Sequence, residues 1–246
     1  MKVNLELVAR DARNAVQRND VIIVIDVLRC TSSIITALTN GAHAIIPTPT
    51  LSAARLEVAE HPQYLLAGER RGVKPTGFML GNSPLEFTRD RVAGKTIVMT
   101  TTSGTAAFAR VKGHPYVLVG AFLNAAAVAQ MALTLSEQNH LNISFALSGK
   151  RGSFSLEDFL GAGAVIHHFA NTNLTYSDTA YASLLAYEHA HPSLFSALCE
   201  GTHAKTLINL GFRNDVIHCT QMNKYATVPL LQDDSIISIH KPTQNL

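Results

Sequence analysis

A run of five β-forming residues, 21–25, is the clearest hydrophobic pattern in the chain. It is long enough for a buried strand and too short for a helix. Asp26 stands where this strand should end, and a helical pattern then runs to Asn40–Gly41. In an open α/β sheet, ligands bind at such strand ends. The turn between them carries candidate anion-binding or metal-phosphate-binding residues: Arg29, Thr31, Ser32 and Ser33.

The same alternation of apolar runs and helical patterns continues along the chain. It is typical of a mostly parallel sheet covered by helices on both faces, a three-layer α/β/α fold. Residues 155–210 read as mostly helical. Strands are predicted at 2–8, 44–47, 63–67, 95–99, 116–119, 142–147, 216–219 and 236–239.

Length and composition fit a globular enzyme. The 246 residues, 47% of them apolar and 15% charged, suffice for one α/β domain over 1–246. An alternative organisation has two lobes, in which the mostly helical segment 155–210 is an addition to the main domain. The net charge of +2 gives no reason to expect nucleic acid or a membrane as a partner.

Cysteine usage and the amino-terminal segment predict a cytoplasmic protein. Three widely spaced cysteines are typical of free thiols in a reducing compartment. Glu6 and Arg10 interrupt the first apolar stretch, so no signal sequence is expected. The alanine-rich helix after Asn124 is a candidate interface for a homodimer.

Polar groups concentrate at four strand ends, which would gather at one edge if the strands are parallel. A helix start there would hold phosphate through its free N–H groups and dipole. Arginine forks bind carboxylate, sulfonate or phosphate oxygens, and carboxylates hold Mg²⁺. The four sets are Asp26 with 29–33, Glu69 with Arg70 and Arg71, 100–105, and Lys150–Arg151 with Glu157–Asp158.

Each feature also has a purely structural interpretation. Asp26 could cap the turn that follows it, and 100–105 could be only a capped helix start. The segment 69–71 could be a solvated loop. Asp158 could form a capping box with Ser155 and serve only its own helix, with Glu157 facing solvent.

Several familiar chemistries lack their signatures. No GxGxxG follows a strand, and neither a P-loop nor a G-x-S-x-G elbow is present. Asp26 lacks the second aspartate, two residues on, of a haloacid-dehalogenase-type phosphatase. Cys30 lacks the arginine of a cysteine-phosphatase loop.

Five motifs in order resemble the 2-phosphosulfolactate phosphatase family. They are IDVLRCTSSIITAL, LLAGERRG, GFMLGNSP, TTTSGT and SFSLEDFLGAG, and they cover about 21–163. The resemblance implies an α/β fold with a topology specific to the family, and a Mg²⁺-dependent hydrolase. Its named reaction converts (2R)-O-phospho-3-sulfolactate to sulfolactate and phosphate in coenzyme M biosynthesis.

The motifs carry over residue by residue. Ser103 stands where the family pattern has Asn, and Gly161 departs from a frequent Cys, so the substrate is less certain than the reaction class. The matching site residues are Asp26, Arg29, Glu69, Arg70, Asn82, Ser83, Thr101, Thr102, Gly104, Thr105, Glu157 and Asp158.

We therefore expect a Mg²⁺-dependent phosphatase acting on 2-phosphosulfolactate or a related small phosphorylated hydroxy acid. Asp26, with Glu69 or Asp158, is expected to hold the metal, and these three with Glu157 form the catalytic set. The helix start 101–105 is expected to hold the phosphate. Arg29, Arg70, Lys150 and Arg151 are expected to hold the carboxylate and sulfonate. A non-catalytic anion-binding module and a transferase or lyase on phosphorylated hydroxy acids remain alternatives.

Overall fold

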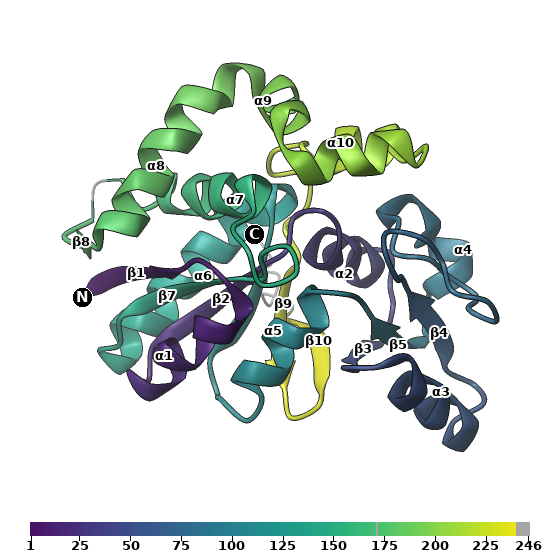
Figure 1. The fold of residues 1–246 in the computed structure, drawn as a ribbon. Helices are drawn as coiled ribbons and strands as arrows, with labels where there is room; N and C mark the ends of the chain where they lie inside the picture. Colours follow the sequence, from purple (N-terminus) through teal and green to yellow (C-terminus); the bar gives the residue numbers. More distant parts are fainter. Residues whose placement is uncertain (171, 240–246) are drawn as a thin grey trace, which may run out of the picture.

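The computed structural model describes residues 1–170 and 172–239, and the described chain forms a single ten-stranded sheet flanked by helices (Figure 1). This confirms the predicted α/β class. The predicted domain, 1–246, extends over 171 and 240–246, which lie outside the described residues. In sheet order the strands are β4 (Leu65–Gly68), β5 (Thr96–Thr100), β3 (Ala44–Pro47), β10 (Ser235–Ile239), β9 (Val228–Gln232), β6 (Val117–Gly120), β2 (Val21–Ile25), β7 (Ile143–Leu147), β1 (Lys2–Glu6) and β8 (Thr175–Tyr176).

The sheet consists of two parallel blocks joined by an antiparallel hairpin. One block is β4-β5-β3 and the other is β6-β2-β7-β1-β8. The β9–β10 hairpin, yellow in Figure 1, pairs antiparallel with β6 on one side and β3 on the other. Because three antiparallel steps separate β3 from β6, the two blocks run in opposite directions.

Residues after strands of both blocks line one pocket, so the sheet must turn between the blocks. In a flat sheet, the carboxyl ends of the two blocks would lie at opposite edges. Residues that follow strands of both blocks nevertheless line one pocket. The joints allow this turn, because one residue pair, Ile236–Ile45, connects β10 to β3 and only two connect β6 to β9.

Helices cover both faces of the sheet. Most of them follow the strands that the sequence pattern predicts. They are α1 (Ala12–Gln17), α2 (Cys30–Thr39), α3 (Leu51–Glu60), α4 (Arg89–Val92), α5 (Gly104–Val111), α6 (Ala125–Asn139), α7 (Leu156–His167), α8 (Asp178–Ala190), α9 (Leu194–Glu200), α10 (Thr202–Asn209) and α11 (Arg213–Cys219), with short 3-10 turns at Ala9–Asp11, Pro84–Glu86, Phe122–Asn124 and His191–Ser193.

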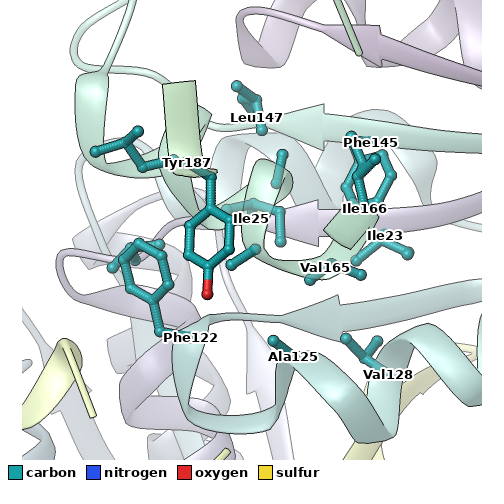
Figure 2. Close-up of a cluster of buried hydrophobic side chains, with 14 of the residues drawn as sticks. Ile23, Ile25, Phe122, Ala125, Val128, Phe145, Leu147, Val165, Ile166 and Tyr187 are labelled. Carbon is teal, nitrogen blue, oxygen red and sulfur yellow. The ribbon is translucent and has the colours of Figure 1, made fainter. Parts of the chain in front are cut away.

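Alternate residues of β2 belong to two separate cores. Ile23 and Ile25 pack with apolar residues of α6, α7 and α8, as the close-up in Figure 2 shows. Ile22 and Val24 pack on the opposite face with α1, α2 and α5. A strand buried on both faces reads as an unbroken apolar run, which is the pattern of 21–25. The three-layer prediction is therefore confirmed.

Two sequence predictions near the carboxyl terminus need correction. The segment 216–219 is not a strand but the end of α11, in which Val216 and Cys219, one helical turn apart, are both fully buried. The pattern also missed β9, which begins Val228–Pro229. In addition, α2 begins at Cys30, so Thr31 and Ser32 belong to its first turn and not to a loop.

None of the described helices is both long and apolar enough to cross a membrane.

The contact between α7 and α8 generates a stability prediction. A methyl group at Gly163 would lie 2.2 Å from the Ser183 carbonyl oxygen and 2.7 Å from Cβ of Tyr187. Glycine to alanine in a helix ordinarily stabilises by about 1 kcal/mol. Here overpacking should dominate, so Gly163→Ala should lower the free energy of unfolding by about 1–3 kcal/mol in a urea titration. A stability equal to or above the wild type would contradict the tight crossing.

Candidate active site

One pocket lies where the strand ends of the two blocks meet. Residues after β2, β4, β5 and β7 contribute to it, and α7 and α10 complete its wall. The predicted gathering of these strand ends is thus observed. The lining residues are Asp26, Leu28, Arg29, Glu69, Arg71, Gly72, Asn82, Thr101, Thr102, Ser103, Gly149, Lys150, Arg151, Glu157, Asp158, His203, Thr206, Leu207 and Leu210.

Asp26 follows β2 directly and has one oxygen available to a ligand. Its Oδ1 accepts a hydrogen bond from the Cys30 N–H at 3.1 Å, so it does cap the turn. Its Oδ2 has no hydrogen-bond partner among the described residues. Burial, together with the charges of Glu69 and Glu157, raises the pKa of Asp26 to about 6, against the lowering effect of the Cys30 N–H and His203. The ionised Asp26 carboxylate is therefore held in an unfavourable, buried environment.

Gly104 is the first residue of α5, and its lack of a side chain lets this helix start lie close to Asp26. A Cβ atom at residue 104 would lie 2.7 Å from Asp26 Oδ2 and 2.5 Å from Cβ of Cys30. Glycine is thus required for the close approach of this helix to the carboxylate. The predicted role of Gly104 in the site is spatial, since it does not line the pocket.

Glu69 and Asp158 each tie two loops together through backbone amides. Glu69 accepts hydrogen bonds from the N–H groups of Gly72 and Thr102, both at 2.6 Å. Asp158 accepts them from Val27 at 2.8 Å and Gly149 at 3.1 Å. Glu69 is therefore not part of a solvated loop, and Asp158 does not serve only its own helix. Both carboxylates fix the shape of the pocket.

The remaining acid, Glu157, is paired with a histidine that the sequence interpretation did not include. Glu157 is 3% exposed, and its Oε1 lies 2.7 Å from Nδ1 of His203 on α10. Burial alone would raise the pKa of Glu157, but the hydrogen bond and charge of His203 lower it overall. Glu157 therefore does not face solvent.

Arg29 lines the pocket but is largely committed to the protein. Its Nη1 pairs with Asp215 Oδ2 at 2.6 Å, and its Nη2 donates to the Gly72 carbonyl at 2.7 Å. The ring of Phe212 lies 4.3 Å from its guanidinium carbon. Ser83 donates to the other oxygen of Asp215 at 2.7 Å. Arg29 and Ser83 thus dock α11 onto the site.

Several predicted substrate-binding residues lie behind the pocket instead of lining it. Thr31 and Ser32 are fully buried and donate to the carbonyl groups of Asp26 and Val27. Arg70 donates to Thr100 Oγ1 and to the Glu69 carbonyl. Thr105 is tied to Thr101 within the turn. These hydroxyl and guanidinium groups hold the loops in place.

Polar residues that follow β5, together with Asn82, form one wall of the pocket. Thr101, Thr102 and Ser103 line it at the start of α5. Asn82 is 4% exposed, and its Oδ1 is buried without a hydrogen-bond partner among the described residues. A buried amide group without a partner is available to a polar ligand.

Two matched turns present cations at the pocket. Arg70 and Val73 bridge one turn, and Lys150 and Ser153 bridge the other. Their central residues are Arg71–Gly72, with φ of 55° and 85°, and Arg151–Gly152, with φ of 52° and 80°. Positive φ at both positions is the conformation of a type I′ turn, which is uncommon for arginine. One turn comes from each parallel block, and each places an arginine at the pocket.

Sequence reasoning missed some of the lining residues. Arg71 belongs to the strand-end set 69–71, but the sequence analysis gave it no role in substrate binding. His203, Thr206, Leu207 and Leu210 had no signal, since α10 comes late in the chain and carries no recognised motif. Asp215 stands directly before the segment 216–219, which the pattern predicts as a strand, and only the folded chain brings it to Arg29.

The donor set fits a divalent cation that keeps several waters. Within residues 1–170 and 172–239, no three His, Cys, Asp or Glu side chains are grouped closely enough to form a metal-ligand cluster. Mg²⁺, however, is usually bound through one or two carboxylates, with waters and substrate phosphate completing its shell. Asp26 Oδ2, which has no hydrogen-bond partner among the described residues and belongs to a buried carboxylate that lines the pocket, matches that requirement.

The pKa of Asp26 leads to a prediction about stability and pH. Since its pKa is raised from 3.8 to about 6, the folded protein binds this proton more tightly than the unfolded chain. Stability should therefore fall as the pH rises from about 4 to 6. Without divalent cations, Asp26→Asn should be more stable than the wild type at pH 8, on the order of 2–3 kcal/mol, and no more stable at pH 4.

Denaturant titrations at the two pH values test this, with Asp233→Asn as the control. Asp233 is exposed in a turn, and asparagine tolerates its positive φ of 53°. An Asp26→Asn variant less stable than the wild type at pH 8 would contradict the unfavourable burial of the Asp26 carboxylate.

Comparison with known proteins identifies the family of this chain. The sequence model of the 2-phosphosulpholactate phosphatase family matches residues 7–234. A probable 2-phosphosulfolactate phosphatase of Thermotoga maritima is 40% identical over 209 residues, 85% of this chain and 88% of the relative. Proteins of the same name from Clostridium beijerinckii and Carboxydothermus hydrogenoformans are 34% identical over 241 residues (96% and 99% of the two chains) and 37% over 230 (93% and 92%). The chain belongs to the 2-phosphosulpholactate phosphatase family.

Proposed function

We propose that the protein is a Mg²⁺-dependent phosphatase that hydrolyses 2-phosphosulfolactate, or a closely related small phosphorylated hydroxy acid, to the free hydroxy acid and phosphate. The observation that carries this proposal is a single pocket that combines an available carboxylate oxygen, a polar helix start and cations on two turns. Family membership supports the same reaction.

The metal would be held by Asp26, with Glu69 or Asp158 as the second carboxylate. When bound, Mg²⁺ supplies positive charge to the phosphoryl oxygens, which phosphoryl transfer needs more than it needs a special nucleophile. The hydrogen bonds of Glu69 and Asp158 to backbone amides leave each carboxylate fixed in orientation.

The chain's own residues would bind and orient the substrate. Thr101, Thr102 and Ser103 would hold the phosphate at the start of α5, where N–H groups and the helix dipole favour an anion. The carboxylate and sulfonate would bind Arg71, Lys150 and Arg151. Arg29 and Arg70 would act indirectly, because their guanidinium groups already bind protein atoms. The cytoplasmic location and the homodimer remain predictions.

The test is phosphate release from 2-phosphosulfolactate by the purified protein, with Mg²⁺ and with excess EDTA. We expect release that EDTA abolishes and added Mg²⁺ restores. A parallel assay with 2-phospholactate, which lacks the sulfonate, should give a higher KM, because one anionic group is missing.

Each contrary outcome points to a different part of the proposal. Release that persists in EDTA would overturn the metal requirement alone. No release from either substrate by a folded protein would overturn the phosphatase assignment. Equal kcat/KM for the two substrates would remove the sulfonate from recognition.

A further inference from the structure

His203 is the pocket residue with acid–base chemistry that no part of the proposed function uses. It is the second residue of α10, and it lines the pocket together with Asp26 and Glu157. Its side chain is 27% exposed, whereas that of its partner Glu157 is 4% exposed. Imidazole is the side chain that most readily gives and takes a proton near neutral pH.

The contact with Glu157 determines which of the two imidazole nitrogens is free for a ligand. Nδ1 lies 2.7 Å from Glu157 Oε1, a short hydrogen bond to a buried carboxylate. A carboxylate oxygen accepts hydrogen bonds, so Nδ1 is the donor in this contact. Nε2 has no hydrogen-bond partner among the described residues and is the nitrogen left for a ligand.

His203 and the expected phosphate site line the same pocket. His203 lines it from α10, whereas Thr101, Thr102 and Ser103 line it at the start of α5 and Asp26 lines it from the end of β2. Asp26 lies beside Gly104 at the start of α5, where the phosphate is expected. A substrate bound in this pocket is therefore accessible to the imidazole from α10.

The proposed reaction needs a proton donor beside the leaving oxygen of the substrate. Hydrolysis of an alkyl phosphate releases an alkoxide, which is a poor leaving group unless it is protonated as the bond breaks. General acid catalysis of this kind contributes about 100- to 10,000-fold. Glu69 and Asp158 are less suited to the role, because backbone amides hold both oxygens of each side chain in place and one of the two residues is expected to bind the metal.

We propose that His203 is the general acid that protonates the leaving oxygen of the substrate, and that Glu157 is the residue that positions it. The inference rests on the proposed phosphatase function. The water oxygen forms the new bond to phosphorus as the bond from phosphorus to the alkyl oxygen breaks. The alkyl oxygen takes the Nε2 proton, and the dihydrogen phosphate that results returns one proton to the neutral imidazole.

The test compares 2-phosphosulfolactate with its analogue in which sulfur replaces the bridging oxygen. The analogue keeps the phosphate, carboxylate and sulfonate, but its thiolate leaves without protonation. His203→Gln should lower kcat on the oxygen substrate at least about 100-fold and leave kcat on the sulfur analogue within about threefold of the wild type. Glu157→Gln should shift the ratio of the two kcat values in the same direction by a smaller factor.

His43→Gln is the matched control, since His43 is exposed in the loop before β3 and lies outside the pocket. Equal losses on both substrates in His203→Gln, or no loss on the oxygen substrate, would overturn the role of His203 and leave the phosphatase assignment standing. A wild-type protein that releases phosphate from neither substrate would overturn both. A Glu157→Gln variant with an unchanged ratio would remove Glu157 from the mechanism.

Discussion

Four carboxylates buried in one pocket are the constraint around which this molecule is built. Asp26, Glu69, Glu157 and Asp158 are each at most 7% exposed. Charges so close together and so far from water repel one another, and the raised pKa values of Asp26 and Asp158 reflect burial and this repulsion. Backbone amides donate hydrogen bonds to Glu69 and Asp158. His203 donates one to Glu157. Asp26 keeps one oxygen without a partner, and this oxygen is the one that a cation can reach.

The fold gives these carboxylates their positions by bringing two parallel blocks of sheet together. Asp26 follows β2 in one block, and Glu69 follows β4 in the other. The β9–β10 hairpin joins the blocks through few residue pairs, so the sheet can turn there. Glu69 and Asp158 then hydrogen-bond to loops of neighbouring strands and prevent the strand ends from separating. Two matched Arg-Gly turns, one from each block, place cations opposite the acids.

The sequence was informative where local pattern determines structure. The strands at 21–25 and 44–47 follow from the pattern of apolar residues, and the structure confirms them. Asp26, Glu69 and the 101–103 wall were found because polar residues directly follow apolar strands. Long-range contacts were not predictable in this way. His203 reaches Glu157 across 46 positions, and Asp215 reaches Arg29 across 186, and neither pairing leaves a local signal. The strand prediction at 216–219 failed because Val216 and Cys219, one helical turn apart, are buried on one face of α11, whereas Ile217 is exposed.

We propose that a divalent cation neutralises the charge that Asp26 brings into the pocket. The midpoint of thermal unfolding of the wild type and of Asp26→Asn, followed at pH 8 during a MgCl₂ titration, tests this. We expect the wild-type midpoint to rise with Mg²⁺, by the equivalent of about 2.7 kcal/mol at 100 times the dissociation constant. The Asp26→Asn midpoint, already higher at the start, should stay constant. Equal rises in both proteins, or no rise in the wild type, would contradict it.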